Sequence, residues 1–275
     1  METTAAPPAL ETRDLTVRYG DRAILDGVNL RIMTGEVFVV MGPSGCGKTT
    51  LLKCLVRLLD PTGGTVLVNG RDVAGLDADQ SDELRRTMGM VFQGGAMLNS
   101  ISLRENVALP IRAHLDMPPG LVDEAVGMKL AQVGLLEAAE RMPSELSGGM
   151  RKRAGIARAL ALDPKLLFFD EPTSGLDPVT SDGIDNLVLE LREALGATMV
   201  VVTHDLPSAR KIADRLVVLS RGRALAEGTW DEVAATRDPE VRDFLDRHAV
   251  PVEAGGASIF GGGPEAGSGR EGGAP

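Results

Sequence analysis

The chain has 275 residues and a formal net charge of −10. This length fits one large domain, or one domain with a subdomain and a tail, and the acidic balance argues against nonspecific nucleic-acid binding through bulk positive charge. The two cysteines, Cys46 and Cys54, are too few for a disulfide framework or a cysteine-built metal site.

The first residues, Met1 to Pro8, lack the basic start and the apolar core of a secretion signal. No uninterrupted apolar stretch approaches the roughly 20 residues of a membrane-spanning helix. We therefore expect a soluble, intracellular chain that takes part in membrane processes only through a partner.

The N-terminal part of the chain shows antiparallel strand patterns. Leu15, Val17 and Tyr19 alternate with polar residues, and residues 24–32 form a second extended stretch. Between residues 66 and 73, extended segments flank Asn69-Gly70, a pair that tolerates the positive φ angles of a tight hairpin turn. These segments predict a small antiparallel sheet.

Three short apolar runs predict the strands of a second sheet: Val37–Met41, Leu166–Phe169 and Met199–Val202. Each run is continuous rather than alternating, which is typical of strands buried on both faces of a largely parallel sheet. Helical patterns lie between the runs, so the predicted class is α/β.

The interval from about residue 94 to residue 160 is predicted to be a helical subdomain inserted into the α/β core. One buried helix face is predicted from residues at helical spacing, namely Val122, Ala125, Val126, Leu130 and Val133. Farther along, residues 251–275 contain nine glycines and few large apolar side chains. We expect this tail to be disordered when free, because it cannot bury enough surface to offset its ordering entropy.

Residues 42–49 match the pattern G-x-x-x-x-G-K-[ST], between the predicted strand Val37–Met41 and a helical run that begins near Lys48. In this context the glycines let the backbone fold around phosphates, and the helix N-terminus adds positive potential. Lys48 would neutralise charge on the β- and γ-phosphates, and the Thr49 hydroxyl would ligate Mg²⁺. The alternative is a glycine-rich turn with a surface lysine. The predicted phosphate loop consists of Gly42, Pro43, Ser44, Gly45, Cys46, Gly47, Lys48 and Thr49.

Two acidic residues end the run Leu166–Phe169. Asp170 and Glu171 are thereby placed at the carboxyl edge of a buried strand, where α/β sheets bind ligands. Asp170 would hold the metal through water, and Glu171 would polarise the water that attacks the γ-phosphate. A solvated acidic turn is the alternative.

Two further residues fit the same edge of the sheet. His204 follows the run Met199–Val202 and would donate to the γ-phosphate and orient the attacking water, although a lone histidine is more often structural. Gln93 would reach Mg²⁺ and the water through its amide oxygen, but alone it carries little information.

A second glycine-containing helix start lies at residues 146–150, Leu-Ser-Gly-Gly-Met, ahead of a basic helix that begins with residues 151–153. Ser147 would cap this helix, and Gly148 and Gly149 allow close backbone approach to an anion. The residues alone leave open whether this is a second phosphate site or a capped helix with an exposed basic face.

Together these motifs resemble the ATP-binding subunits of ABC transporters. The phosphate loop, Gln93, residues 146–149, residues 170–171, residues 174–177 and His204 occur in the order of that family, across roughly residues 8–250. The resemblance implies a P-loop NTPase (RecA-like) core that binds ATP and Mg²⁺ and hydrolyses ATP, with an antiparallel β subdomain and an inserted helical subdomain. The implied catalytic residues are Lys48, Gln93, Glu171 and His204, the implied metal ligands are Thr49, Gln93 and Asp170, and the implied nucleotide contacts add Tyr19, Thr50, Ser147, Gly148, Gly149 and Asp177 to the phosphate loop.

In that family, two nucleotide-binding domains pair head to tail and hold ATP between the phosphate loop of one copy and the Ser-Gly-Gly segment of the other. Ser147, Gly148 and Gly149 would therefore contact the γ-phosphate bound by the partner copy. Asp177 would lie at the dimer seam, and Tyr19 would stack on adenine. The resemblance implies a homodimer with two equivalent sites.

One departure from the family pattern is Met150, where the usual motif ends in Gln. Leu-Ser-Gly-Gly-Met is similar to the ATPases of MCE/Mla-type lipid transport systems, as are residues 92–97, 142–145 and 238–245. That resemblance implies phospholipid transport between inner and outer membranes, with the chain peripheral on the cytoplasmic face of the inner membrane. The implied partners are an integral-membrane permease, a small STAS-domain protein and a periplasmic MCE lipid-binding protein, with no nucleic acid.

Other functions fit the same catalytic residues. The chain would serve equally as the ATPase of another ABC importer, for an amino acid or another solute, because the permease handles the substrate. A non-transport ABC ATPase is a second alternative, although the sequence shows neither the long coiled coils of DNA-repair types nor the fused halves of translation factors. A module that binds ATP without hydrolysing it is disfavoured by Glu171 and His204.

Overall fold

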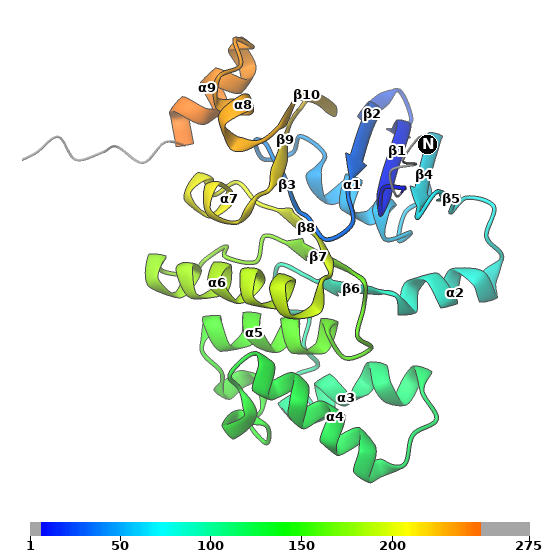
Figure 1. Cartoon of the computed structure of the whole chain (residues 1–275), viewed down its shortest axis with the longest axis vertical. Helices are drawn as coiled ribbons and strands as arrows, with labels where there is room; N and C mark the ends of the chain where they lie inside the picture. The colour runs from blue at the N-terminus through cyan, green and yellow to red at the C-terminus, as the bar shows by residue number, and fades with distance from the viewer. Residues whose placement is uncertain (1–6, 249–275) are drawn as a thin grey trace, which may run out of the picture.

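The computed structural model describes residues 7–248 and builds them around a parallel sheet with strand order β10-β9-β3-β8-β7-β6 (Figure 1). β10 pairs with β9 antiparallel, and the other neighbours are parallel. The apolar runs predicted as buried strands are confirmed as β3, β7 and β8. The bounds are β3 Val37–Met41, β6 Met88–Val91, β7 Leu166–Asp170, β8 Thr198–Val202, β9 Arg215–Ser220 and β10 Arg223–Gly228.

The continuous apolar runs follow from burial on both faces of this sheet. In β3, Val37, Val39 and Met41 belong to the core cluster that the helices α3 to α7 share. Phe38 and Val40 belong to the cluster on the opposite face, together with side chains of the antiparallel sheet and of α1. Because each face has its own apolar layer, successive residues are all apolar and no alternation remains.

The predicted antiparallel sheet is also confirmed, with strand order β2-β1-β4-β5. Asn69 and Gly70 form the turn between β4 and β5, with φ angles of 51° and 78°, as the hairpin prediction requires. The strands are β1 Leu10–Tyr19, β2 Arg22–Ile32, β4 Gly63–Val68 and β5 Arg71–Asp72.

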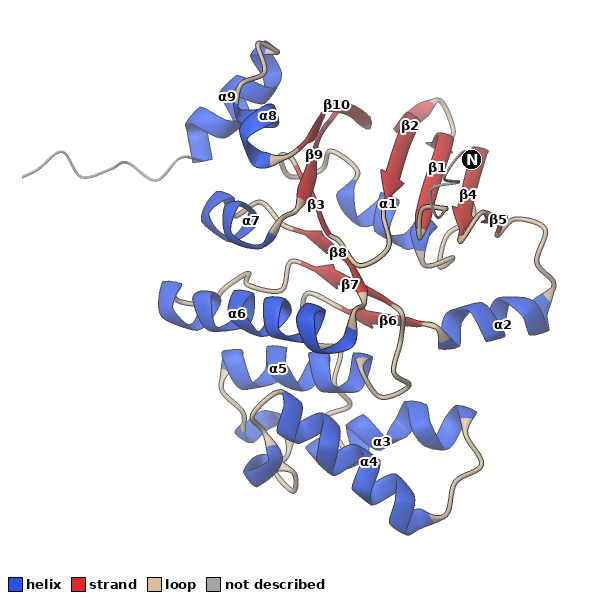
Figure 2. Ribbon diagram, viewed as in Figure 1, coloured by secondary structure: helices blue, strands red, loops and turns tan. Residues whose placement is uncertain are grey.

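Most helices lie on the face of the parallel sheet away from the antiparallel sheet, whereas α1 lies between the two sheets (Figure 2). The buried face predicted near residue 122 belongs to α4, where Val122, Val126 and Leu130 are buried and Ala125 is half-buried. The helices are α1 Lys48–Leu55, α2 Ala78–Arg86, α3 Leu103–His114, α4 Pro119–Gln132, α5 Gly148–Ala159, α6 Pro178–Leu195, α7 Leu206–Ile212, α8 Trp230–Ala234 and α9 Pro239–His248, with short 3-10 turns at η1 Leu136–Ala138 and η2 Pro143–Glu145.

The helices α3, α4 and α5 fall within the interval predicted as a helical subdomain. α5 packs against β6 and α6 on one side and against α3 and α4 on the other, so it joins that group of helices to the sheet (Figure 1). The domain limits of 8–250 and about 94–160 stay predictions, and the tail predicted at 251–275 lies outside the described residues.

Candidate active site

The loop between β3 and α1 has a backbone that only glycine adopts at two of its positions. Gly42 has a φ of 145°, and a Cβ built there would lie 2.1 Å from the carbonyl oxygen of Leu219. Gly47 has a φ of 112°, and its Cβ would lie 2.9 Å from the carbonyl oxygen of Ile24. Positive φ and close main-chain contact both exclude a side chain, so the loop takes this path only with these glycines.

Lys48, the first residue of α1, folds its side chain back over the loop. Its Nζ donates to the carbonyl oxygens of Gly42 at 2.7 Å and Pro43 at 3.1 Å, and the side chain is buried. No side-chain hydrogen bond caps α1, because residue 47 is glycine. The helix N-terminus therefore presents its main-chain N–H groups and a lysine ammonium at one place, which is the arrangement that binds phosphate.

A cavity of about 330 Å³ lies over this loop. Gln93 enters it from the segment after β6, Glu171 from the end of β7 and His204 from the segment after β8. These three strands are parallel neighbours, so their carboxyl ends meet at one edge of the sheet. The lining consists of Ile24, Ser44, Gly45, Gly47, Lys48, Thr49, Thr50, Gln93, Glu171 and His204.

Glu171 and His204 are in direct contact within this cavity. The Nδ1 atom of His204 lies 2.9 Å and 2.8 Å from the two carboxylate oxygens of Glu171. An ionised carboxylate only accepts hydrogen bonds, so beside an ionised Glu171 the Nδ1 atom of His204 is the donor and the orientation of the ring is fixed. The carboxylate of Glu171 is thereby fixed at the cavity wall.

The main chain of Glu171 is in the left-handed region, with a φ of 51°. Residues other than glycine are disfavoured in this region by about 1–3 kcal/mol, and they keep this conformation only where neighbouring groups hold the backbone. The N–H of Glu171 donates to the carbonyl oxygen of Val202 at 2.9 Å, and its own carbonyl accepts from the hydroxyl of Ser174 at 3.0 Å. Such an outlier at a cavity wall is typical of a functional position.

Asp170 is not part of the cavity lining, and its buried carboxyl accepts a hydrogen bond from the Thr49 hydroxyl of the phosphate loop. Burial raises the pKa of the Asp170 carboxyl, and the charge of Glu171 acts in the same direction. The charge of Lys48 and the Thr49 hydroxyl act to lower this pKa. A carboxylate that is desolvated next to a hydroxyl gains from a nearby cation, so the residues present fit Mg²⁺, which keeps several of its own waters and needs few protein ligands.

The start of α5 is not part of the lining of this cavity. We call residues 146–150 the signature segment. Ser147 caps α5, because its hydroxyl oxygen accepts from the main-chain N–H of Met150 at 3.2 Å, which confirms the predicted cap. Ser147, Gly148 and Gly149 line neither this cavity nor the larger one described below.

Two other predicted nucleotide contacts also lie outside the cavity lining. Tyr19, at the end of β1, is 60% exposed. Asp177 caps α6, where one carboxylate oxygen accepts from the N–H groups of Val179 at 3.1 Å and Thr180 at 3.0 Å. Neither Tyr19 nor Asp177 lines the cavity that holds Glu171. Their predicted roles therefore require a second copy of the chain or the bound nucleotide.

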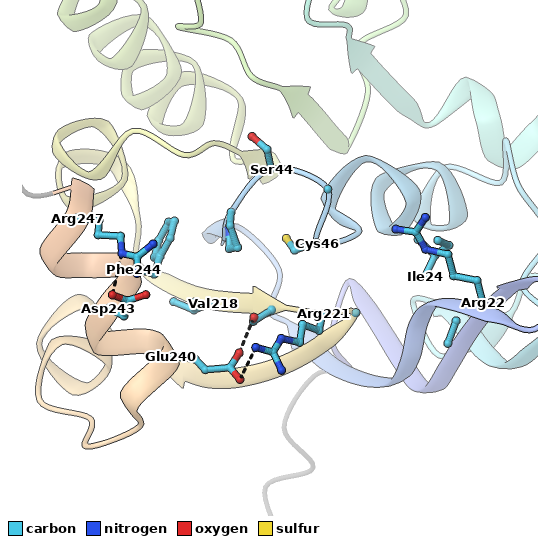
Figure 3. A pocket seen from close by; sticks show the side chains of 15 residues that line it. Arg22, Ile24, Ser44, Cys46, Val218, Arg221, Glu240, Asp243, Phe244 and Arg247 are labelled. Carbon is cyan, nitrogen blue, oxygen red and sulfur yellow. Dashed lines mark hydrogen bonds and ion pairs between the residues drawn. The ribbon is translucent and has the colours of Figure 1, made fainter.

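A larger cavity, of about 550 Å³, borders the other side of the phosphate loop (Figure 3). Pro43 and Cys46 line it, and burial raises the pKa of the Cys46 thiol. On its far wall Glu240 accepts from the Ser220 hydroxyl at 2.7 Å. Of the described residues, Lys48, Gln93, Glu171 and His204 are all missing from this lining, so the smaller cavity is the better candidate for hydrolysis.

The sequence prediction missed two residues near the site. Ile24 of β2 lines the cavity, and nothing in an apolar strand residue indicates that. Lys152 of α5 is buried, and its Nζ donates to the carbonyl oxygens of Gln93 and Glu171 at 2.5 Å and 2.8 Å. The interpretation of α5 as a helix with an exposed basic face is therefore wrong at this residue.

Comparisons with known proteins agree with this geometry. The family model described as ABC transporter matches residues 25–174. The intermembrane phospholipid transport system ATP-binding protein MlaF of Haemophilus influenzae is 45% identical over 86% of this chain and 89% of its own length. The probable ribonucleotide transport ATP-binding protein mkl of Mycobacterium leprae is 40% identical over 88% of this chain and 70% of its own. A solved dimer of the ATP-binding cassette MJ0796, bound to ADP and Pi after hydrolysis, matches with a TM-score of 0.74 at 34% identity, covering 80% of this chain and 98% of that chain.

Proposed function

The chain belongs to the ABC transporter family of ATPases, and from this we propose that it binds Mg-ATP and powers phospholipid transport through an MCE/Mla-type membrane complex. The observation that carries the hydrolytic part is the convergence of Lys48, Gln93 and the Glu171–His204 pair on one cavity. The phospholipid cargo rests on the similarity to the relative from Haemophilus influenzae.

The phosphate loop supplies the electrostatic part of the site. The α1 N-terminus and the ammonium of Lys48 would hold the β- and γ-phosphates, because both place positive potential at the loop. Thr49, Gln93 and Asp170 would hold Mg²⁺, and the ion would offset the charge of the phosphates. Tyr19 would stack on the adenine from its exposed position at the end of β1.

The Glu171–His204 pair would supply the proton transfer. Glu171 would accept a proton from the attacking water, and its fixed position at the cavity wall would orient that water. His204 donates to this carboxylate through Nδ1, and in the doubly protonated ring its second nitrogen would also donate to the γ-phosphate. Gln93 lines the same cavity from the segment after β6 and would contact the water as well as the metal.

We place the second wall of the site on another copy of the chain. The signature segment begins a helix whose N-terminus has positive potential, yet within one chain it lines neither cavity. In a head-to-tail homodimer, Ser147, Gly148 and Gly149 would close on the γ-phosphate bound by the partner, and Asp177 would lie at the seam. The structural neighbour that is a dimer supports this arrangement.

None of the described helices combines the length and the apolar character that crossing a bilayer requires. By its similarity to the relative from Haemophilus influenzae, we propose that the chain acts peripherally, on the cytoplasmic face of the inner membrane, attached to an integral-membrane permease. A small STAS-domain protein and a periplasmic MCE protein complete the proposed complex. ATP binding would favour the closed dimer and product release the open one, which moves the permease between two shapes.

Transport of ribonucleotides is the second candidate, because a relative that is 40% identical carries that name. The two candidates differ in cargo and share the ATPase. Reconstitution with the co-purified permease in proteoliposomes separates them, since transfer of a fluorescent phospholipid and uptake of a radiolabelled ribonucleotide are measured on the same preparation. ATP-dependent nucleotide uptake without lipid transfer would contradict the phospholipid assignment.

The hydrolytic role is tested with Glu171→Gln in the same complex. We expect ATP turnover at least ~10²-fold slower with ATP binding retained, because the general base is lost while the phosphate loop is unchanged. Lipid transfer should stop in parallel. The matched control is Glu193→Gln, an exposed glutamate on α6, which should leave turnover unchanged. Wild-type turnover in Glu171→Gln would remove Glu171 as the base.

A further inference from the structure

Lys152 is a buried cation on the signature helix, and its three hydrogen-bond partners all lie at the hydrolytic site of its own chain. The side chain is 7% exposed. Its Nζ donates to the carbonyl oxygens of Gln93 at 2.5 Å and Glu171 at 2.8 Å, and it contacts the hydroxyl of Ser174 at 3.3 Å. An ammonium has three donors, so these partners use its full capacity.

The three partners belong to three different segments of the chain. Gln93 follows β6, Glu171 directly follows β7, and Ser174 lies in the turn before α6. One side chain therefore connects segments that are separated in sequence and that meet only at the carboxyl edge of the sheet. Two of the partners are main-chain carbonyls, so this connection sets the path of the backbone and not the position of a neighbouring side chain.

The connection matters most at Glu171, because its backbone is in the disfavoured left-handed region. The carbonyl oxygen of Glu171 accepts from Lys152 and from Ser174, and its N–H donates to Val202. If the ammonium is removed, the carbonyl oxygen of Glu171 keeps only the neutral donors of Ser174. Hydrogen bonds from neutral donors are weaker than those from a charged group. The direction of the Glu171 carboxylate toward His204 follows from this backbone.

The charge of Lys152 is also matched to its surroundings. Burial lowers the pKa of the Lys152 ammonium, whereas the charges of Glu171 and Asp170 act to raise it. A buried cation with carboxylates nearby, two main-chain acceptors and one hydroxyl acceptor is held in place, because any displacement leaves it desolvated and unpaired.

α5 extends this connection to its own N-terminus, where the signature segment lies. Lys152 lies three residues after Gly149, so about 4.5 Å of helix separates it from the signature segment along the helix axis. α5 is one continuous helix from Gly148 to Ala159. A shift of its N-terminus therefore carries the Lys152 ammonium, and with it the carbonyls of Gln93 and Glu171.

We propose that Lys152 is a positioning residue that holds the main chain of Glu171 and Gln93 and couples the signature segment, which closes on the partner's nucleotide, to the general base of its own chain. This inference rests on the proposed function through the role of Glu171. It gives the two sites of the dimer a short route of communication through a single buried side chain.

The test uses Lys152→Met in the complete transporter complex, since methionine keeps most of the apolar stem and removes the donors. We expect kcat to fall about tenfold or more, while the Kd for a fluorescent ATP analogue stays within about threefold of wild type. Lys152→Arg, which retains charge and donors, should recover part of the lost kcat. The matched control is Arg153→Met, because Arg153 is the next residue on α5 and donates to Val133 and Gly183, away from the site.

A double-mutant cycle with Glu171→Gln separates the two proposals. If Lys152 acts through Glu171, Lys152→Met should slow single-turnover hydrolysis much less in the Glu171→Gln background than alone. Equal kcat losses in Lys152→Met and Arg153→Met would show that α5 is merely loosened, and would overturn the positioning role. An unchanged kcat in Lys152→Met would overturn it as well. If Glu171→Gln itself turns over at the wild-type rate, the proposed function fails first.

Should Lys152→Met not fold, as judged by its circular dichroism and melting temperature, the same measurements are made on Lys152→Gln. Glutamine is shorter and uncharged but retains N–H donors, so it weakens the connection without emptying the position. A kcat loss intermediate between Lys152→Arg and Glu171→Gln, with ATP affinity retained, supports the proposal. Loss of ATP affinity in proportion to kcat contradicts it.

Discussion

Two glycine-rich helix starts in this chain look alike in sequence and differ in structure. The phosphate loop uses glycine because Gly42 and Gly47 have positive φ angles and no room for a Cβ. At the start of α5, Gly148 and Gly149 are helical without a positive φ angle, and the constraint is side-chain packing, which is tightest at Gly149. A Cβ at Gly149 would lie 2.5 Å from the Cγ2 atom of Thr180, at the start of α6.

The two starts also differ in what completes them. The N-terminus of α1 has no side-chain cap and faces a cavity lined by Gln93, Glu171 and His204 of the same chain. The N-terminus of α5 is capped by Ser147, and among residues 7–248 it lines neither of the two cavities at the phosphate loop. One helix start thus lies in a cavity with the candidate catalytic groups of its own chain, whereas the other is, in our proposal, a wall for the site of a second copy.

The largest effect on ATP turnover is expected from a substitution in the second helix start, at Ser147. Ser147→Arg should reduce ATP turnover in the assembled complex by ~10²-fold or more, because a long cation at the dimer seam prevents closure on the partner's γ-phosphate. ATP affinity of the isolated chain should stay within about threefold of wild type, since the phosphate loop is unchanged. Lys48→Ala should lose both turnover and affinity.

The difference between Ser147→Arg and Lys48→Ala is measured by fluorescence titration of ATP binding to each isolated chain and by ATP turnover of each complex. Ser144→Arg is the matched control, because Ser144 is exposed, lies three residues earlier and does not cap α5. If Ser147→Arg lowers ATP affinity of the isolated chain as much as Lys48→Ala does, the signature segment belongs to the site of its own chain and the dimer assignment is wrong. ATP turnover that survives Ser147→Arg in the assembled complex would also contradict the dimer assignment.

The fold was predictable from the sequence wherever one local pattern has one physical cause. Val37–Met41 and Met199–Val202 are apolar throughout because both faces of the parallel sheet are covered, and Asn69-Gly70 adopts the positive φ angles that the pair tolerates. The phosphate loop was predictable for the same reason, because Gly42 and Gly47 are required by backbone geometry that a sequence pattern records.

Other features of the site depend on contacts that leave no local pattern. Lys152 looked like one of three exposed basic residues, because its partners are main-chain oxygens that every residue type offers. The Glu171–His204 contact spans 33 residues, and its direct geometry could only be seen once β7 and β8 were side by side. Ile24 lines the cavity because of how β2 approaches the loop, which its own strand pattern does not specify.

The site at the phosphate loop also affects the stability of the fold, and Asp170→Asn measures this effect. Burial raises the Asp170 pKa, so the folded state binds a proton there more tightly than the unfolded chain does. The ionised carboxylate therefore destabilises the fold at neutral pH. The substitution should raise the melting temperature by about 1–3 °C at pH 7.5, without nucleotide, while turnover is lost with the metal ligand.

The sign of the pH dependence is fixed by the same argument. Stability associated with Asp170 is highest below its ordinary pKa and falls as the pH rises through its raised pKa, so the gain from asparagine should shrink between pH 7.5 and pH 4. Asp123→Asn, an exposed position on α4, is the control and should show no such trend. A gain that grows toward acid pH would show that Asp170 is stabilised as a carboxylate by its neighbours.

The smallest effect is expected at Met150, where the signature segment departs from the family pattern. Its main-chain N–H is already used by the Ser147 cap, and its half-buried side chain packs against the apolar core instead of facing a polar partner. Met150→Gln should therefore leave turnover within about threefold and reduce stability by about 1 kcal/mol or less. The measurements are turnover of the complex and urea unfolding of the isolated chain. A turnover gain of tenfold or more would mean that an amide at this position contributes to the partner's site, and that the second helix start is chemically incomplete without it.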